Sequence, residues 1–479
     1  MRLHNTLNRQ TVDFKPIMEE TTSLYTCGPT VYSHYHVGNL RNAVFNDTLR
    51  RALEAEGFKV RHVMNITDVG HLTSDADEGE DKLEKGAKAE GKTVWQVADR
   101  YTEAFKQDVA SLNIQPPNGY EGSKDNYARA TDFIDEQVKL VEILVEKGYA
   151  YQTEQAIYFD ISKLADYGEL TGQKLSDKEI AARAEVVTDS AKRHPQDFAV
   201  WFFAAGNFAG HAMKWASPWG EGFPGWHLEC SAIIHSTLGD PIDIHTGAVD
   251  LIGTHHTNEI AQTEAAYGNK LANYWVHNEY VLVDGQKMSK SLGNVYTLSD
   301  VRAKGVSPLA LRLLYLQSHY RSQLNFTWES LGAAQNFLNR LYAFADLKFQ
   351  SQLGHKNDIG QTYQPALNKM RESISNDLNT SEAVAELSAL ASESEAHGQD
   401  TNMIQDVLEK IDLLFGLDLS TRTDITDEQK IAINERETAR NAEDWSKADE
   451  LREELLKQGL DIKDSDRGPV WSRTLGHSI

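Results

Sequence analysis

The stretch SLYTCGPTVYSHYHVGN, residues 23–39, decides the fold because it joins a strand-like segment to a tight turn and a helix. Cys27, one of only two cysteines in the chain, ends the strand-like part, and a His-x-Gly turn follows. The next segment, NLRNAVFNDTLRRALEAEG, carries apolar residues at helical spacing and ends at Gly57. KVRHVMNI then alternates like a second strand. The order of strand, helix and strand predicts a βαβ unit.

A strand that runs through a glycine turn into a helix forms a natural site for phosphate. The free backbone N–H groups of the first helical turn and the helix dipole both point at an anion bound there. We therefore expect residues 23–66 to belong to a Rossmann-like nucleotide-binding domain with a parallel sheet.

The composition limits the class of protein. The chain has 479 residues, of which 40% are hydrophobic and 25% charged, which is typical of soluble globular proteins. The sequence has no apolar run of membrane-spanning length and no apolar signal core at its start, so we expect a cytoplasmic protein without a membrane partner. The formal net charge of −23 argues against broad nonspecific binding of nucleic acid but leaves room for a local basic face.

The remaining segments differ in character. The highly charged stretch 71–91 predicts an exposed connection, and apolar periodicity predicts a helix from Ala128 to Lys147. The aromatic stretch KWASPWGEGFPGWHLEC indicates an insertion before the core resumes near Trp226. YWVHNEYVLVDG predicts a strand that ends in an Asp-Gly turn, and the polar stretch 350–362 predicts a loop.

Cys27 and Cys230 are too few for a disulfide framework. They are either buried free thiols or ligands of a shared metal ion, and the second interpretation requires further ligands. THHTNEIAQTEAAYG supplies candidates, because His255 and Glu259 are four residues apart in a helix-favouring run. His256 faces nearly the same way, so the spacing leaves both histidines open. Two thiolates, an imidazole and a carboxylate suit tetrahedral zinc.

The run KMSKS, residues 287–291, places two lysines among small hydroxylated residues. Such a loop can be an ordinary solvated turn. It can also surround a polyphosphate and offset the charge that develops on a leaving pyrophosphate.

HVGN and KMSKS, in this order, resemble the two signatures of class I aminoacyl-tRNA synthetases, HIGH and KMSKS. Further stretches narrow the resemblance to cysteinyl-tRNA synthetases: NTLNRQ, FKPI, YTCGPTVY, NITDV, PGWHLECSA, HHTNEIAQ, KMSKSLGN and HYRSQLNF. The resemblance extends over essentially the whole chain, including NDLNTSEA and the tail ending in DRGPVW.

The resemblance implies that one zinc ion is bound by Cys27, Cys230, His255 and Glu259, which selects His255 over His256. The zinc would bind the thiolate of substrate cysteine as a further ligand, and serine would be rejected because its hydroxyl stays protonated. By the same resemblance Gly28, Thr67 and Trp226 line the cysteine pocket, although Trp226 can also serve core packing.

The resemblance also implies the ATP site. His36 and Asn39 would contact the phosphates, Lys287 and Lys290 would neutralise the β- and γ-phosphates, and Asp250 would bind the ribose. ATP would be used together with Mg²⁺. Asn39 replaces the last histidine of the HIGH signature, but its amide can still donate to phosphate.

Two other positions depart from the family pattern. Thr246 and Ala248 stand in HTGAVD where relatives carry a more glycine-rich run, and they add side chains near the expected adenine site.

The family implies an α/β fold with a Rossmann-like catalytic domain, an insertion, an α-helical domain and a small mixed C-terminal module. The ranges we expect are 1–115 and 226–306 for the two catalytic halves, 116–225 for the insertion, 307–415 for the helical domain and 416–479 for the anticodon module.

The expected activity is that of a cysteine–tRNA ligase. It activates L-cysteine with ATP and transfers it to the 3′-terminal adenosine of tRNA(Cys), and we expect a monomer. One alternative is a related ligase that joins activated cysteine to an amino sugar, but such a small acceptor needs no anticodon module. Another is a non-catalytic paralogue that binds tRNA or zinc, which the intact signatures argue against.

Overall fold

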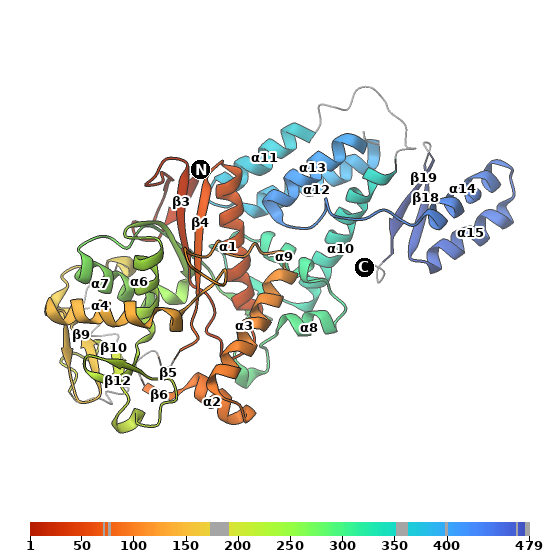
Figure 1. Ribbon diagram of the computed structural model, residues 1–479. Helices are drawn as coiled ribbons and strands as arrows, with labels where there is room; N and C mark the ends of the chain where they lie inside the picture. The colour runs from red at the N-terminus through yellow and green to blue at the C-terminus, as the bar shows by residue number, and fades with distance from the viewer. Residues whose placement is uncertain are drawn as a thin grey trace. The chain divides into compact units, whose positions relative to one another are not determined.

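A computed structural model describes residues 1–69, 72–74, 78–172, 191–350, 363–397, 401–465 and 468–474. The chain forms two compact units (Figure 1). Unit 1 comprises Met1–Val281 and Tyr320–Gln323, and unit 2 comprises Leu282–His319 and Leu324–Ile479. Across the described residues, no helix combines the length and the apolar character that crossing a membrane requires. The predicted domain ranges stay predictions.

The centre of unit 1 is a five-stranded parallel sheet with the strand order β14-β13-β3-β4-β7. Its strands are β3 (Thr21–Thr26), β4 (Lys59–Ile66), β7 (Ala128–Arg129), β13 (Ile242–Ala248) and β14 (Ala272–Asn278). From β3 the chain proceeds to β4 and β7 on one side, and later to β13 and β14 on the other. The carboxyl ends of β3 and β13 therefore flank a topological switch point, where α/β proteins bind ligands. This sheet confirms the predicted Rossmann-like fold.

Helices connect and cover the strands of unit 1 (Figure 1). They are α1 (Val37–Ala55), α2 (Lys82–Glu90), α3 (Val94–Ser111), α4 (Ile134–Glu146), α6 (Trp226–Thr237) and α7 (His255–Tyr267). Helix α1 joins β3 to β4, as the βαβ prediction requires. Its apolar face, which includes Val44, Leu49 and Leu53, is buried. Burial of this stripe stabilises the helix far more than helix propensity does.

The insertion between β7 and β13 contains an antiparallel sheet with the order β11-β12-β10-β9-β8. Its strands are β8 (Ala150–Gln152), β9 (Ala156–Phe159), β10 (Phe198–Phe203), β11 (Trp215–Ser217) and β12 (Gly220–Pro224). Two hairpins complete the strands of unit 1: β1 (Arg2–Asn5) with β2 (Gln10–Asp13), and β5 (Leu72–Ser74) with β6 (Glu78–Asp81).

Unit 2 is mainly helical, as predicted for the chain after Ser307. Its helices are α8 (Leu298–Ala303), α9 (Pro308–Leu316), α10 (Trp328–Asp346), α11 (Tyr363–Ser375), α12 (Thr380–His397), α13 (Thr401–Phe415), α14 (Asp427–Asn441) and α15 (Trp445–Lys457). A three-stranded sheet has the order β16-β15-β17, from β15 (Val281–Val283), β16 (Gln286–Lys287) and β17 (Leu324–Phe326). A C-terminal hairpin of β18 (Leu460–Ser465) and β19 (Gly468–Arg473) confirms the mixed tail.

Both units also contain short 3₁₀ helices. They are η1 (Ala130–Phe133), η2 (Ile161–Lys163), η3 (Glu169–Thr171), η4 (Gly206–Phe208), η5 (Val249–Leu251), η6 (Lys290–Leu292) and η7 (Leu347–Phe349).

The prediction of an exposed connection over 71–91 is wrong for its second half, which forms α2. Asp81 caps the start of this helix by accepting from the N–H groups of Leu83 and Glu84, and Gly91 ends it in a left-handed conformation. Leu83 and Ala87 are buried, so the many charges of this stretch belong to the outer face of an amphipathic helix. Residues 70–71 and 75–77 lie outside the described residues.

Two further boundaries differ from prediction. The helix expected from Ala128 begins only at Ile134, because Ala128–Arg129 pairs with β4 as the edge strand β7. The single strand expected before the Asp-Gly turn is two strands, β14 and β15, with Glu279 and Tyr280 between them. The predicted polar loop at 350–362 lies outside the described residues except for its first residue.

Candidate functional site

The predicted site residues of unit 1 follow the carboxyl ends of three neighbouring strands. Cys27 comes directly after β3, Thr67 directly after β4, and Asp250 two residues after β13. Cys230 lies on α6, and α7 begins at His255. The carboxyl ends of parallel strands meet at one edge of the sheet, which is where a substrate of an α/β protein binds.

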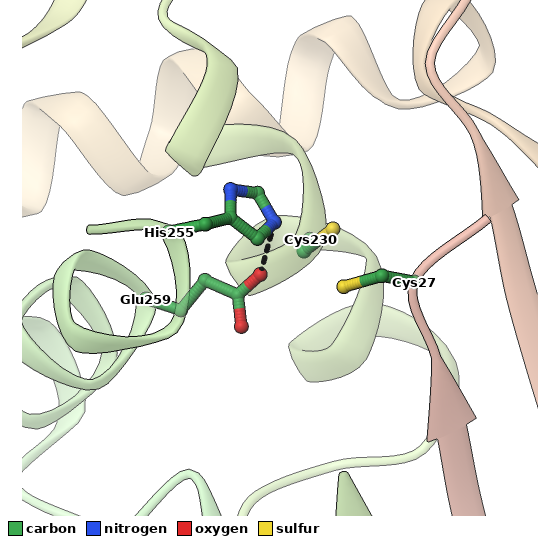
Figure 2. A group of neighbouring side chains, drawn as sticks. All are labelled: Cys27, Cys230, His255 and Glu259. Atoms are coloured by element: carbon green, nitrogen blue, oxygen red, sulfur yellow. Dashed lines mark ion pairs between the residues drawn. The ribbon is translucent and has the colours of Figure 1, made fainter. Parts of the chain in front are cut away.

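Cys27, Cys230, His255 and Glu259 converge from this strand end and from α6 and α7 (Figure 2). One ligand atom from each residue lies within 4.8 Å of the other three. His255 and Glu259 are four residues apart on α7 and therefore share a face of the helix. A tetrahedral zinc ion holds its ligands roughly 3–4 Å apart, so little contraction is needed to bind one here.

The chemistry of these four side chains fits a metal ion. All four are buried, with exposed fractions of 9% or less. Glu259 Oε1 lies 2.6 Å from Nε2 of His255, yet this oxygen makes no hydrogen bond of acceptable geometry. Two sulfurs, a ring nitrogen and a carboxylate oxygen match the preferences of zinc.

A second group of possible ligands shares two of these residues. Cys27, His245, His256 and Glu259 also present ligand atoms within 4.8 Å of one another. The thiol of Cys27 lies 3.3 Å from Nε2 of His256. His256 therefore belongs to a second possible ligand group, which shares Cys27 and Glu259 with the first.

Several buried histidines support the ligands, and no sequence pattern predicts that they lie together. His227 Nδ1 lies 3.0 Å from Nδ1 of His255, and His245 Nε2 lies 2.7 Å from Oε2 of Glu259. His256 Nδ1 lies 2.7 Å from Nε2 of His277. Such outer hydrogen bonds fix the ring orientation and the tautomer of a ligand. The one local signal was that three of them, His227, His245 and His277, each directly follow an apolar residue.

Burial controls the proton affinities of the four side chains. It raises the pKa of the Cys27 thiol and raises that of the Cys230 thiol well above its usual range. Burial alone would lower the pKa of His255, but Glu259 and Cys230 raise it to about 10. Burial alone would raise the pKa of Glu259, but His255 and His245 hold it well below its usual range. A cation bound among these groups would convert the thiols to thiolates.

Gly28 and Thr67 are joined by the side chain of Asn65. Asn65 Oδ1 accepts from the N–H of Gly28 at 2.8 Å, and Asn65 Nδ2 donates to Thr67 Oγ1 at 3.1 Å. The Thr67 hydroxyl donates to Glu229 Oε2 at 2.7 Å. A Cβ built on Gly28 would lie 1.8 Å from the carbonyl oxygen of Asn65, so only glycine fits this turn. Burial raises the pKa of Glu229 well above its usual range.

Trp226, the first residue of α6, stacks on the imidazole of His255. The ring centroids are 4.5 Å apart with an interplanar angle of 27°. The indole is only partly buried, which leaves part of its surface for a ligand. The packing role considered for Trp226 is thus present, and its role in lining a cysteine pocket stays a prediction.

His36 caps the N-terminus of α1. Its Nδ1 accepts from the N–H groups of Gly38 at 3.1 Å and Asn39 at 3.3 Å, and Asn39 Oδ1 accepts from the N–H of His36 at 3.4 Å. Since Nδ1 accepts, the neutral ring carries its proton on Nε2. His36 is therefore prepared to donate a hydrogen bond through Nε2 at a helix N-terminus, a favourable place for phosphate.

The segment around Asp250 begins at the buried end of β13. Thr246 donates its hydroxyl to Oδ1 of Asn46 on α1 at 2.8 Å, so this side chain is engaged inside the unit. A Cβ on Gly247 would lie 2.6 Å from Cε1 of His256, which requires glycine there. Asp250 lies in η5 and is exposed.

Lys287 and Lys290 belong to unit 2 and are both exposed. Lys287 ends β16, opposite Leu282 of β15, and Lys290 begins η6. The loop between them is held by Asn294, whose Oδ1 accepts from the N–H of Ser289 at 2.8 Å and whose Nδ2 donates to the carbonyl of Lys287 at 3.3 Å.

Comparison with known proteins decides the family. Residues 13–336 match the family model described as the catalytic domain of class I (C) tRNA synthetases, and residues 422–471 match the cysteinyl-tRNA ligase anticodon binding domain. The chain is 42% identical to cysteine–tRNA ligase 1 of Burkholderia lata, over 98% of this chain and 96% of that protein. The chain belongs to the cysteine–tRNA ligase family.

Other members of the cysteine–tRNA ligase family are similar to this chain in sequence over nearly its full length. The enzyme of Treponema denticola is 39% identical over 99% of both chains, and that of Thermus thermophilus is 38% identical over 98% of both. The predicted family and fold class are thus confirmed.

Solved structures show the same fold at low identity. A methionyl-tRNA synthetase of Mycobacterium tuberculosis in complex with methionyl-adenylate has a TM-score of 0.60 at 13% identity, covering 84% of this chain and 93% of that one. A leucyl-tRNA synthetase of Agrobacterium radiobacter in a ternary complex has a TM-score of 0.61 at 12% identity, covering 85% of both chains.

The basic residues in the C-terminal part of this cysteine–tRNA ligase family member form ion pairs. Arg440 Nη1 lies 2.7 Å from Oδ2 of Asp464, and Lys447 Nζ lies 3.0 Å from Oε2 of Glu450. Arg436 also pairs with Asp464, at 2.7 Å. These cations are largely balanced by neighbouring acids, in keeping with the acidic composition of the chain.

Proposed function

We propose that this chain attaches L-cysteine to tRNA(Cys) and selects cysteine through one zinc ion bound by Cys27, Cys230, His255 and Glu259. The observation that carries the proposal is the buried convergence of these four donor groups at the switch point of the sheet. When bound, zinc would supply a positive centre that accepts the substrate thiolate. Serine offers no comparable ligand, so the site would discriminate by roughly 10⁴–10⁵ without a separate editing site.

The remaining pocket would orient cysteine for reaction. The close turn at Gly28, tied to Thr67 through Asn65, presents main-chain and hydroxyl groups beside the ligand cluster. Trp226 would cover the other side while it holds the ring of His255. A substrate held in one orientation reacts faster because its translational and rotational freedom is already lost.

Adenylation would take place beside the start of α1. A carboxylate oxygen of cysteine attacks the α-phosphorus of ATP, and the bond to the bridging oxygen breaks as pyrophosphate leaves. His36 would donate from Nε2 to a phosphate oxygen, with Asn39 beside it, because its Nδ1 is occupied as the helix cap. Lys287 and Lys290 would balance the charge that develops on the departing phosphates. Mg²⁺ would accompany the ATP.

Asp250 would bind the ribose of ATP with its exposed carboxylate. In the second step, a ribose hydroxyl of the terminal adenosine of tRNA attacks the acyl carbon of the adenylate, and AMP leaves. Unit 2, which contains the part of the chain similar to the anticodon binding domain, would contact the tRNA. We propose that the enzyme acts in the cytoplasm as a monomer.

The activity test uses the full-length protein with stoichiometric zinc. We expect cysteine-dependent exchange of pyrophosphate into ATP, little exchange with serine, and acylation of tRNA(Cys). Exchange without tRNA acylation would favour the alternative ligase for an amino-sugar acceptor. Failure of cysteine to support exchange in zinc-replete protein would favour the non-catalytic paralogue.

A further inference from the structure

Arg41 lies on α1, five residues after His36, and is almost completely buried, with 3% of its surface exposed. Its guanidinium donates to three main-chain carbonyls of unit 1. Nη1 donates to the carbonyls of Glu279 and Tyr280, each at 2.9 Å, and Nη2 donates to that of Ser322 at 2.6 Å. Hydrogen bonds from a cation are stronger than those between neutral groups.

These carbonyls lie where the chain leaves unit 1 and where it returns. Glu279 and Tyr280 connect β14 to β15, which begins at the next residue. Ser322 lies in the returning segment Tyr320–Gln323, directly before β17 begins at Leu324. Strands β15 and β17 are neighbours in the three-stranded sheet, whose third strand, β16, ends at Lys287. Within unit 1, Arg41 therefore holds together the segment from which the chain leaves for the lysine loop and the segment by which it returns.

A second contact on α1 reinforces this arrangement. The ring of Phe45, one turn after Arg41, stacks on Tyr320 with centroids 4.9 Å apart and an interplanar angle of 19°. The N–H of Glu279 donates to the carbonyl of Tyr320 at 2.8 Å, which joins the outgoing and returning segments directly. Only arginine has the planar fork of donors that can bind three carbonyls at once.

We propose that Arg41 is a positioning residue for adenylation: it holds the helix that begins at His36 to the two segments of unit 1 that connect to the chain bearing Lys287 and Lys290, and it acts on the reaction through that lysine loop. The inference deepens the proposed function and rests on it. A displacement of a reacting group by about 1 Å can cost roughly 10² in rate. We therefore expect the effect in the rate of adenylation and not in the binding of cysteine.

The first experiment compares full-length Arg41→Met and Arg41→Lys in cysteine-dependent exchange of pyrophosphate into ATP. We expect kcat to fall by roughly 10²-fold in Arg41→Met and roughly 10-fold in Arg41→Lys, with unchanged zinc content and cysteine KM. Arg50→Met is the matched control, since Arg50 is buried on the same helix and donates to the carbonyl of Pro116 at 2.6 Å. Arg50→Met should keep kcat within about twofold of the wild-type value.

The second experiment is a double-mutant cycle with Lys290→Ala. If Arg41 acts by placing the lysines, Arg41→Met should lower kcat by less than about threefold once Lys290 is already absent. Multiplication of the two single effects would overturn the proposal, because it would mean that Arg41 acts independently of the loop. The cycle is run with Arg41→Lys instead if Arg41→Met does not fold.

The outcomes distinguish a failure of the proposed function from a failure of the role proposed for Arg41. A wild-type enzyme without cysteine-dependent exchange would overturn the proposed function itself. An active wild-type enzyme whose kcat is unaffected by Arg41→Met would overturn the role of Arg41 alone. An equal loss in Arg41→Met and Arg50→Met would likewise overturn it, because a general loss of helix packing would then explain both.

Discussion

The ligand cluster around Cys27 and the lysine loop at 287–291 are opposite in character. The four side chains of the cluster are buried, come from three elements and are supported by further buried histidines. In the loop, Lys287 and Lys290 are exposed and the backbone is held mainly by Asn294. In the proposed function, the two regions perform different tasks. Selection of the amino acid needs a rigid, dry site, whereas neutralisation of phosphate charge can be performed by a loop that closes on its substrate.

The largest effect is expected from a substitution in the buried ligand cluster. Cys230→Ser should lose most of its zinc and lower kcat/KM for cysteine activation by 10³-fold or more, on the order of the discrimination that such a site provides. The overall fold should survive, because we expect the metal to serve selection more than stability. Zinc analysis, pyrophosphate exchange and thermal unfolding check the three parts.

His256→Gln is the matched control for the choice between the two ligand groups. This variant should keep one zinc ion per chain, because His256 belongs only to the second group. Loss of zinc from His256→Gln together with its retention in Cys230→Ser would assign the metal to that second group. Global unfolding of Cys230→Ser would instead show that the metal is structural.

In the exposed lysine loop, Lys290→Ala should slow adenylate formation by roughly 10²–10³-fold. This is the cost of removing one donor that stabilises developing charge. Cysteine affinity should stay within about twofold of the wild-type value, because in the proposed mechanism this lysine acts in the transition state. Stopped-flow measurement of adenylate formation and equilibrium binding of cysteine test both statements. Lys304→Ala, an exposed lysine in the same unit, serves as the control. A large loss of cysteine binding in Lys290→Ala would contradict the assignment.

Gly28→Ala tests how rigid the buried site is. The new methyl group would lie 1.8 Å from the carbonyl oxygen of Asn65, so the backbone must shift. We expect the free energy of unfolding to fall by about 1–3 kcal/mol and the KM for cysteine to rise. Gly332→Ala should not destabilise the protein, since Gly332 lies on α10 and a Cβ there meets nothing within 4 Å. Equal stability of the two variants in denaturant titrations would mean that the backbone at Gly28 can move to accommodate a methyl group.

The smallest effect is expected at the ion pair of Arg436 and Asp464, whose carboxylate is partly exposed. Hydrogen bonds and charge from Arg436, with Arg440 adding to the charge, lower the pKa of Asp464. Its ionised form is therefore stabilised in the folded state, and this stability is present above the usual aspartate pKa and lost as the pH falls. Asp464→Asn should cost about 1 kcal/mol or less at pH 7, since a third of this carboxylate is exposed. Unfolding curves of the two proteins should converge as the pH falls through the lowered pKa of Asp464, and a constant difference across pH would contradict this account.

The sequence predicted local features well because local rules determine them. The βαβ unit that contains Cys27 and His36 follows from apolar periodicity and a glycine turn, and β3, α1 and β4 lie where that periodicity predicts. The four proposed metal ligands needed the family resemblance. Spacing on α7 leaves His255 and His256 equal, and both contribute to a possible ligand group.

The remaining differences depend on contacts between distant parts of the chain. His245 and His277 join the ligand cluster only because β13 and β14 pair beside β3, which no local pattern encodes. The division between β14 and β15 falls at Glu279 and Tyr280, whose carbonyls accept from Arg41 more than 200 residues earlier. Charge density misled the prediction for α2, since its capping residues and buried leucine outweigh its charges.

We propose that a zinc ion held by four protein side chains takes up the sulfur of the substrate. X-ray absorption at the zinc edge, recorded on the full-length protein with and without cysteine, tests this most directly. We expect two sulfur ligands per zinc in the free enzyme, from Cys27 and Cys230, three after addition of cysteine, and two after addition of serine. A sulfur count that stays the same when cysteine is added would contradict it.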